Sequence, residues 1–303
     1  MLHTESTLDC STEKHPRVLF VVAAAVLSCE RMPDSGRPHT FPRVTRNAII
    51  LAAGMGLRLR SVVDDRPKGL IEIQGETLVG RSVRLLRDVG IARITLVVGH
   101  RAVDYERYAE GQSDITLAVN PAFASTGSMA SLAAGLERVD SPVLVLESDI
   151  AYEARALTAL LAAPADATLL SGPTGAGDEV WVDAPDGLVR AMSKNAADLK
   201  TITGEFVGLT RLSAAAAAAM RETFVEFERA HGHGRMDYET GALVAIARKQ
   251  PVTAVLIPDL HWGEVDDDRQ YARLVRDVWP AVTGTTRIAT VAGTSDSETH
   301  ERC

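Results

Sequence analysis

The sequence predicts an α/β fold of three layers, in which a Rossmann-like, mixed but mainly parallel sheet lies between helices and carries a small β-rich insertion. From Asn47 onward, short apolar runs alternate with segments of helical spacing, and this alternation is typical of parallel sheets with helices on both faces. The strand-like runs Glu179–Val182, Val189–Ser193 and Glu205–Leu209 then follow one another without a helix between them. These three runs predict the insertion.

The first elements show the alternation most clearly. Ala48–Leu51 is an apolar run that ends shortly before two glycines, which predicts a buried strand followed by a loop. Apolar residues recur at helical spacing over Thr77–Val89, and Gly90 stands where a glycine commonly ends a helix. Ile94–Val98 is again an apolar run and predicts the next strand.

The later elements continue this pattern. Ser213 is expected to cap a long helix through the alanine run Ala214–Ala219, with Phe224 and Phe227 on its inner face. The other predicted elements are, in chain order, the helix Ser125–Leu136, the strand Val143–Leu146, the helix Tyr238–Ala247, the strand Val252–Ile257 and the helix Arg269–Val278.

These elements predict one domain over residues 46–280. Residues 281–303 are polar and rich in Thr and Ser, so we expect a flexible tail. Residues 1–45 are interpreted as a leader that is either unstructured or upstream of a true start at Met32. The alternative is a signal peptide, because an apolar run covers Val18–Ser28, but the acidic residues before this run argue against it.

Composition excludes several classes of function. The formal net charge is −8, so the field of the protein repels polyanions and makes it a poor general binder of nucleic acid or anionic membranes. No run reaches the ~20 apolar residues of a membrane-spanning helix. The cysteines are Cys10, Cys29 and Cys303, which excludes a disulfide framework, a structural zinc site and a catalytic thiol inside the domain. This usage suits the reducing cytoplasm.

The most informative segment is Leu51–Leu70, where a predicted strand runs into Ala-Ala-Gly-x-Gly-x-Arg. Glycine lets backbone N–H groups approach phosphate oxygens, and Arg58 and Lys68 are cations suited to a triphosphate. A lone Gly-x-Gly would be explained equally well by a turn. The segment has neither the Gly-Lys-Ser/Thr of a P-loop nor a full dinucleotide fingerprint. The whole combination predicts a nucleotide-binding loop of another kind.

Carboxylates follow at two further places. Asp149 comes just after a predicted strand, where ligands gather in open α/β sheets, although turn residues and helix caps also occupy such positions. Near the C-terminus, the period of an extended segment places Glu264 and Asp266 on one face. These carboxylates could complete an Mg²⁺ site over bound phosphates, whereas Asp267 and Asp268 fit the acidic first turn of the closing helix.

Together these motifs resemble the nucleotidyltransferase superfamily with a Rossmann-like fold, of the nucleotide-diphospho-sugar transferase type. The resemblance covers Asn47 to Val278, and the Glu-Val-Asp of Glu264–Asp266 looks most like the phosphocholine and phosphonate cytidylyltransferases. It implies catalytic roles for Lys68 and Arg58 and Mg²⁺ binding by Asp149 and Asp266. The nucleotide-binding residues that it implies are Leu51, Ala52, Ala53, Gly54, Gly56, Arg58 and Ser128. Those implied for the acceptor are Lys194, Trp181 and Tyr238.

The resemblance leaves the acceptor open. Phosphocholine enzymes carry an Asn-Asn pair where this chain has Thr126 and Gly127, which argues against phosphocholine. Upstream of Tyr238, the segment His-Gly-His-Gly-Arg-Met brings the cations His231, His233 and Arg235, and positive charge there favours an acceptor with a second anionic group, such as a carboxyphosphonate. The alternative is a surface loop between two helices.

We therefore predict a CTP-dependent cytidylyltransferase of the cytoplasm, with Mg²⁺ as cofactor and a small phosphonate or phosphocholine-like acceptor. Phosphonoformate and 2-substituted ethylphosphonates are examples, and a phosphonate acceptor would place the enzyme in phosphonate metabolism and antibiotic biosynthesis. The acceptor oxygen is already anionic near neutral pH, so the reaction needs no general base. The alternatives are a sugar-1-phosphate nucleotidyltransferase and a non-catalytic nucleotide-binding protein. The sequence leaves open whether the chain forms a homodimer.

Overall fold

A computed structural model of the chain describes residues 45–59 and 66–284. The predicted leader lies outside these residues, apart from Thr45, and so do all three cysteines and the tail beyond residue 284. Among the helices that the structure describes, none has both the length and the apolar character needed to span a membrane.

The central sheet contains nine strands in the described part of the chain, and its middle is parallel. β1 (Asn47–Ala52) lies between β4 (Arg93–Val98) and β6 (Val143–Glu147), and it is parallel to both. β5 (Ile115–Val119) pairs parallel to β4 and forms one edge. This parallel core and its three strand predictions are confirmed.

On the other side of β6, the sheet becomes mixed. β11 (Gly204–Leu212) runs antiparallel to β6, and it also pairs with β8 (Ala167–Ser171) and β9 (Trp181–Asp183). β12 (Thr253–Ile257) is parallel to β8, and β10 (Ala191–Ser193) pairs with β9. The three predicted middle strands therefore extend the main sheet.

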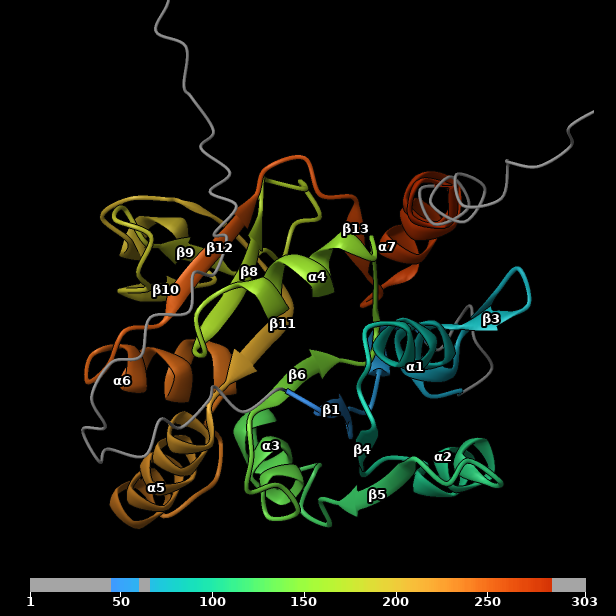
Figure 1. Cartoon of the computed structure of the whole chain (residues 1–303), viewed down its shortest axis with the longest axis horizontal. Helices are drawn as coiled ribbons and strands as arrows, with labels where there is room; N and C mark the ends of the chain where they lie inside the picture. Colours follow the sequence, from blue (N-terminus) through green and yellow to red (C-terminus); the bar gives the residue numbers. More distant parts are fainter. Residues whose placement is uncertain (1–44, 60–65, 285–303) are drawn as a thin grey trace, which may run out of the picture. The chain divides into compact units, whose positions relative to one another are not determined.

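Helices cover both faces of the sheet, which confirms the three-layer prediction (Figure 1). Along β1, Ala48 and Ile50 face a core shared with α1 (Leu78–Asp88), α2 (Ala102–Ala109) and α4 (Arg155–Ala162). Ile49 faces a second core shared with α3 (Ser128–Leu136), α5 (Ala214–His231) and α6 (Val244–Ala247). Because neighbouring strand residues point to opposite faces, a continuous apolar run fills both cores.

Helix ends agree with the expected capping chemistry. The Thr77 hydroxyl accepts a hydrogen bond from the Gly80 N–H at 3.0 Å at the start of α1, and Gly90 follows this helix with φ +85°. Ser213 caps α5 by accepting from the Ala216 N–H at 3.1 Å. Phe224 is buried as expected.

Three predicted helices differ from their predicted extent. α3 begins at Ser128 because residues 121–126 form turns, in which the Asn120 side chain accepts from the Ala122 N–H at 3.0 Å. The predicted helix over 238–247 starts with a π-helical segment, η4 (Tyr238–Leu243). The closing helix comprises α7 (Asp268–Arg273) and the π-helical η5 (Leu274–Val278), and it continues through residue 284.

The continuation corrects the predicted boundary of the tail. Val282 is fully buried and packs with Trp279 and Leu78 in a third core. Residues 281–284 therefore belong to the domain, because the apolar side chain of Val282 packs in the core although the surrounding segment is polar.

The remaining elements are short. They are η1 (Leu57–Leu59), η2 (Lys68–Leu70), β2 (Glu72–Ile73), β3 (Glu76–Thr77), β7 (Ile150–Tyr152), η3 (Ala196–Asp198) and β13 (Trp262–Glu264). Of these, β7 and β13 form an antiparallel pair, with Glu264 opposite Ile150.

Candidate active site

A cavity of about 480 Å³ lies at the carboxyl ends of β1 and β6. This is the edge of an open α/β sheet where ligands are expected. Most of the predicted site residues line it, namely Leu51, Ala52, Ala53, Gly54, Arg58, Lys68, Ser128, Asp149, Lys194, Tyr238 and Asp266. The structure thus brings together residues that are up to 215 positions apart in the sequence, from Leu51 to Asp266.

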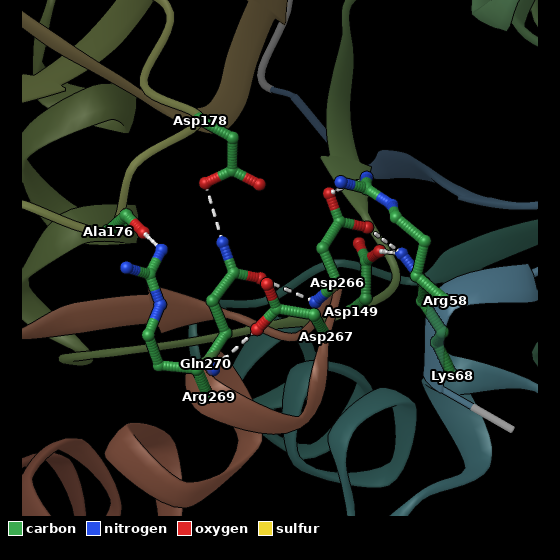
Figure 2. A network of polar contacts seen from close by, with 9 residues as sticks. All are labelled: Arg58, Lys68, Asp149, Ala176, Asp178, Asp266, Asp267, Arg269 and Gln270. Atoms are coloured by element: carbon green, nitrogen blue, oxygen red, sulfur yellow. Dashed lines mark hydrogen bonds and ion pairs between the residues drawn. The ribbon is translucent and has the colours of Figure 1, made fainter. Parts of the chain in front are cut away.

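Two cations and two carboxylates form a network near the carboxyl end of β1 (Figure 2). Lys68 Nζ donates to Asp149 at 3.1 Å and also to Asp266. Arg58 Nη2 donates to the other oxygen of Asp266 at 2.7 Å. Burial alone would lower the pKa of Lys68, but the adjacent Asp149 and Asp266 carboxylates raise it above its ordinary value. Lys68 is therefore a permanent cation at the point where the two carboxylates converge.

The β7–β13 pair explains why Asp149 and Asp266 meet. Asp149 directly precedes β7, and Asp266 follows β13 by two residues. The antiparallel pairing is extended by a hydrogen bond from the Val265 N–H to the Asp149 carbonyl at 3.0 Å. The two carboxylates are thus fixed by backbone hydrogen bonds between distant segments.

Further carboxylates surround this pair. Ligand atoms of Asp178, Glu264 and Asp266 lie within 4.8 Å of one another. Burial raises the pKa of Glu264 to about 10, and neighbouring carboxylates, Glu147 first, add to the rise. Carboxylate oxygens suit Mg²⁺, so Asp178, Glu264 and Asp266 fit the predicted ion, and the role of Asp149 as a ligand stays a prediction.

The glycine loop contributes in two different ways. Gly54 lines the cavity, and no atom lies within 4 Å of the position that its Cβ would take. Gly56 has φ +59° and does not line the cavity. A Cβ there would lie 3.1 Å from Cγ of Lys68. Gly56 therefore gives the loop its turn and leaves space for the Lys68 side chain, and its contact with the nucleotide stays a prediction.

On the opposite wall, α3 and η4 are joined by hydrogen bonds. Ser128 Oγ accepts from the Tyr238 N–H at 2.8 Å and donates to the Glu239 carboxylate at 3.3 Å. The Tyr238 hydroxyl donates to Glu147 at 3.4 Å. All four residues line the cavity. Tyr238 and Glu239 are the first two residues of the π-helical segment, and both lie in this wall.

Trp181 does not line the cavity, and its contact with the acceptor stays a prediction. It lies in β9, where it pairs with Glu205 of β11 and with Ser193 of β10. In a strand, the register decides to which face a side chain points, and the sequence contained no signal for this register.

The predicted cationic segment upstream of Tyr238 also lies outside the cavity. His231 belongs to the last turn of α5, and its ring stacks on Phe227 at 4.2 Å between centroids. His233 and Arg235 are exposed, because the backbone between them is held by a bond from Gly127 N–H to the Gly234 carbonyl at 2.9 Å. The side chains of His231, His233 and Arg235 therefore do not line the cavity.

Three carboxylates that line the cavity were missed by the sequence reasoning. Glu147 lies two residues before Asp149, and the strand period that placed Glu264 with Asp266 would have found it. Glu239 follows Tyr238 directly, at the start of the π-helical segment. Asp178 lies in an irregular segment, and no pattern in the sequence points to it.

Comparison with protein families matches residues 48–228 to the MobA-like NTP transferase domain. Among curated proteins, the chain is 32% identical over 236 residues to the CMP-5'-(3-aminopropyl)phosphonate synthase of Streptomyces rubellomurinus, a match that covers 73% of this chain. It is 32% identical over 85 residues to the choline-phosphate cytidylyltransferase of Streptococcus pneumoniae, which covers 28% of this chain. In both cases the match covers 37% of the relative's own length.

Solved structures support the same fold. The inositol-1-phosphate CTP transferase from T. maritima matches with a TM-score of 0.67 at 16% identity, covering 82% of this chain and 98% of that one. The CTP:phosphocholine cytidylyltransferase from Streptococcus pneumoniae matches with a TM-score of 0.59 at 18% identity, covering 76% and 98%. At these identities, the likeness establishes the fold.

Proposed function

We propose that this chain, which belongs to the MobA-like NTP transferase family, transfers a cytidylyl group from CTP to a small phosphonate or phosphate acceptor. The observation that carries the proposal is the convergence of Lys68, Arg58, Asp149 and Asp266 beside the glycine loop, within one cavity. A protein that only bound a nucleotide would not need this complete set of phosphate-binding and metal-binding groups. The relative from Streptomyces rubellomurinus, named as a CMP-phosphonate synthase, supports CTP as the donor.

The reaction forms one bond and breaks one. An oxygen of the acceptor phosphonate attacks the α-phosphorus of CTP, and the bond from this phosphorus to the oxygen that bridges it to the β-phosphorus breaks. Pyrophosphate leaves with that bridging oxygen. The acceptor oxygen is already anionic near neutral pH, so the protein has to position two polyanions and offset their charge rather than remove a proton.

The residues of the network divide this task. Ala53 and Gly54 line the cavity, and their backbone N–H groups would bind phosphate oxygens. Arg58 and Lys68 offset the charge that develops on the leaving pyrophosphate. Asp149 and Asp266 would hold Mg²⁺, which when bound supplies a Lewis acid for the phosphates. Lys194, on the acceptor side, would bind the phosphonate.

Release of pyrophosphate by the purified protein tests the proposal directly. CTP, UTP, GTP and dTTP are each supplied with Mg²⁺ and with 2-aminoethylphosphonate, 2-hydroxyethylphosphonate, phosphonoformate, phosphocholine or glucose 1-phosphate. We expect release with CTP and a phosphonate. Preference for UTP with glucose 1-phosphate would instead identify a sugar-1-phosphate nucleotidyltransferase, and nucleotide binding without release in any combination would contradict catalysis.

A further inference from the structure

Tyr105 brings a buried hydroxyl to the charged side of the cavity. Its side chain is the one by which α2 packs into the core, it is 1% exposed, and it lines the cavity together with Lys68 and Asp149. Burial raises the pKa of the Tyr105 hydroxyl above its ordinary value, and the Asp149 carboxylate adds to the rise. The hydroxyl is therefore uncharged near neutral pH, and the proposed reaction does not account for it.

The Tyr105 hydroxyl interacts with the direct neighbours of two residues of the proposed site. Its partners are the backbone of Gly69 and the side chain of Ser148. Gly69 follows Lys68 in the chain, and Ser148 precedes Asp149. Lys68 Nζ donates to the Asp149 carboxylate at 3.1 Å (Figure 2). One hydroxyl therefore contacts both of the segments whose side chains form this ion pair.

Gly69 is packed so closely at this point that no side chain fits. A Cβ there would lie 2.8 Å from the hydroxyl oxygen of Tyr105, 3.1 Å from Cβ of Ser148 and 2.7 Å from Cγ2 of Val79. These neighbours belong to α2, to the residue after β6 and to α1. Interiors packed to this density transmit a change in one side chain to the backbone beside it. Glycine therefore lets the segment that carries Lys68 lie directly against the Tyr105 hydroxyl.

The element that carries Lys68 is too short to fix its own place. η2 contains three residues, and its backbone bonds, such as that from the Ile71 N–H to the Lys68 carbonyl at 3.0 Å, lie within it or at its end. They set the shape of η2 but not its position relative to β6. The lysine side chain is a flexible stem, so a misplaced backbone also misplaces Nζ. The contacts of Gly69 therefore help to set the place of Lys68 relative to Asp149.

Resting on the proposed function, we propose that Tyr105 is a positioning residue for cytidylyl transfer. Its hydroxyl holds the backbone at Gly69 beside Ser148 and thereby sets the place of Lys68 relative to Asp149. It acts through these residues rather than on the substrate, and it transfers no proton. A displacement of about 1 Å in a catalytic group can lower a rate by about 100-fold. The hydroxyl therefore raises the rate without adding to substrate binding.

Tyr105→Phe removes the hydroxyl and keeps the ring that packs in the core. With CTP, Mg²⁺ and the best acceptor, we expect kcat to fall by about tenfold or more while KM for CTP changes by less than about threefold, because Lys68 offsets charge that develops in the transition state. Tyr108→Phe is the matched control, since it removes the same atom from the same helix outside the cavity. Thermal melting checks that both variants are folded.

The control should keep both constants within about twofold of the unaltered protein. An unchanged kcat in Tyr105→Phe, an equal loss in Tyr108→Phe, or a loss confined to KM would each overturn the inference.

A double-mutant cycle with Lys68 separates positioning from a general loss of packing. In Lys68→Met the ion pair with Asp149 is absent, so Tyr105→Phe should lower the remaining kcat by less than about threefold in that background. A hydroxyl that contacts the substrate, or that only stabilises the core, would lower kcat by the same factor in both backgrounds, which would overturn the inference. Long incubations with labelled CTP measure the slow variants.

Ser148→Ala tests the contact on the Asp149 side. We expect it to lower kcat by about threefold or more, and we expect the double variant with Tyr105→Phe to match Tyr105→Phe alone within about twofold, because both changes break one contact. Losses that multiply would overturn the inference. Absence of pyrophosphate release by the unaltered protein with every acceptor would instead overturn the proposed function, so the two failures are distinguishable.

Discussion

Gln270 holds the backbone of Asp266 through a hydrogen bond of 2.6 Å from the Asp266 N–H to its Oε1. The same side chain donates from Nε2 to Asp178 at 2.5 Å and is 2% exposed (Figure 2). Gln270 lies in the first turn of α7, which Asp267 caps by accepting from the Gln270 N–H at 2.8 Å. One buried amide therefore fixes two of the carboxylates that surround the proposed ion.

Gln270→Leu should weaken metal binding without removing a ligand. The substitution keeps the approximate volume but leaves both Asp266 and Asp178 without this partner, and loss of such a support commonly lowers metal affinity or activity by about 10- to 100-fold. The Mg²⁺ concentration for half-maximal activity is the measurement. Gln250→Leu is the matched control, because Gln250 donates to Asp166 outside the cavity at 3.1 Å. Equal effects of the two variants would show that Gln270 has no special role.

Asp149→Asn and Asp266→Asn should each reduce kcat/KM by about 10³-fold or more, because each removes a charge from the groups that converge on the phosphates. Both variants should remain folded, since the asparagine amide can stay in place and the β7–β13 backbone bonds are untouched. Pyrophosphate release and circular dichroism are measured together. Substantial activity in both variants would contradict the assignment of these residues.

Glu264→Gln should stabilise the metal-free protein and impair the enzyme. Burial and neighbouring carboxylates raise the pKa of Glu264 to about 10, so at neutral pH folding without metal requires this group to take up a proton, and a neutral amide avoids that cost. We expect a gain of about 1 kcal/mol, seen as a rise in Tm of about 2–4 °C. Activation by Mg²⁺ should need more metal. A lower Tm without metal would contradict the charge argument.

Gly208→Ala tests the space that β11 leaves for Glu147. Alanine at φ +81° is strained, and its Cβ would meet the Glu147 carboxylate, so we expect a loss of about 2–4 kcal/mol in the free energy of unfolding. Gly187→Ala provides the control, because Gly187 has φ +79° and open space around its Cβ position. That variant should lose only about 1–2 kcal/mol. Urea denaturation of both variants separates backbone strain from contact with Glu147.

The sequence predicts the parallel half of the fold well, because apolar runs such as Ala48–Leu51 are long enough to fill both cores. It also predicts the position of Asp149 at the cavity, since a residue that follows a strand of the parallel core lies at the carboxyl edge of the sheet. Asp266 meets Asp149 through the β7–β13 pair. That long-range pairing has no local signal, so the sequence identifies Asp149 and Asp266 as candidates but does not predict that they meet.

Other parts of the site depend on geometry that a periodic pattern does not encode. Trp181 is an aromatic residue in a predicted strand, but the register of β9 with β11 keeps it out of the cavity. Glu239 lines the cavity from the first turn of η4, which is π-helical and therefore departs from the spacing of an α-helix. Helical spacing therefore could not identify Glu239, although it identified the faces of α1 and α5 correctly.

The buried end of the closing helix has a practical consequence for protein engineering. Arg81 is 1% exposed, lies near the rings of Tyr152 and Trp279, and donates from Nη2 to the carbonyl of Val282 at 3.2 Å. A truncation at residue 280 would remove this acceptor and leave the buried guanidinium of Arg81 without it. A shortened chain should therefore end after residue 284, and a fusion partner or affinity tag should be attached beyond that residue.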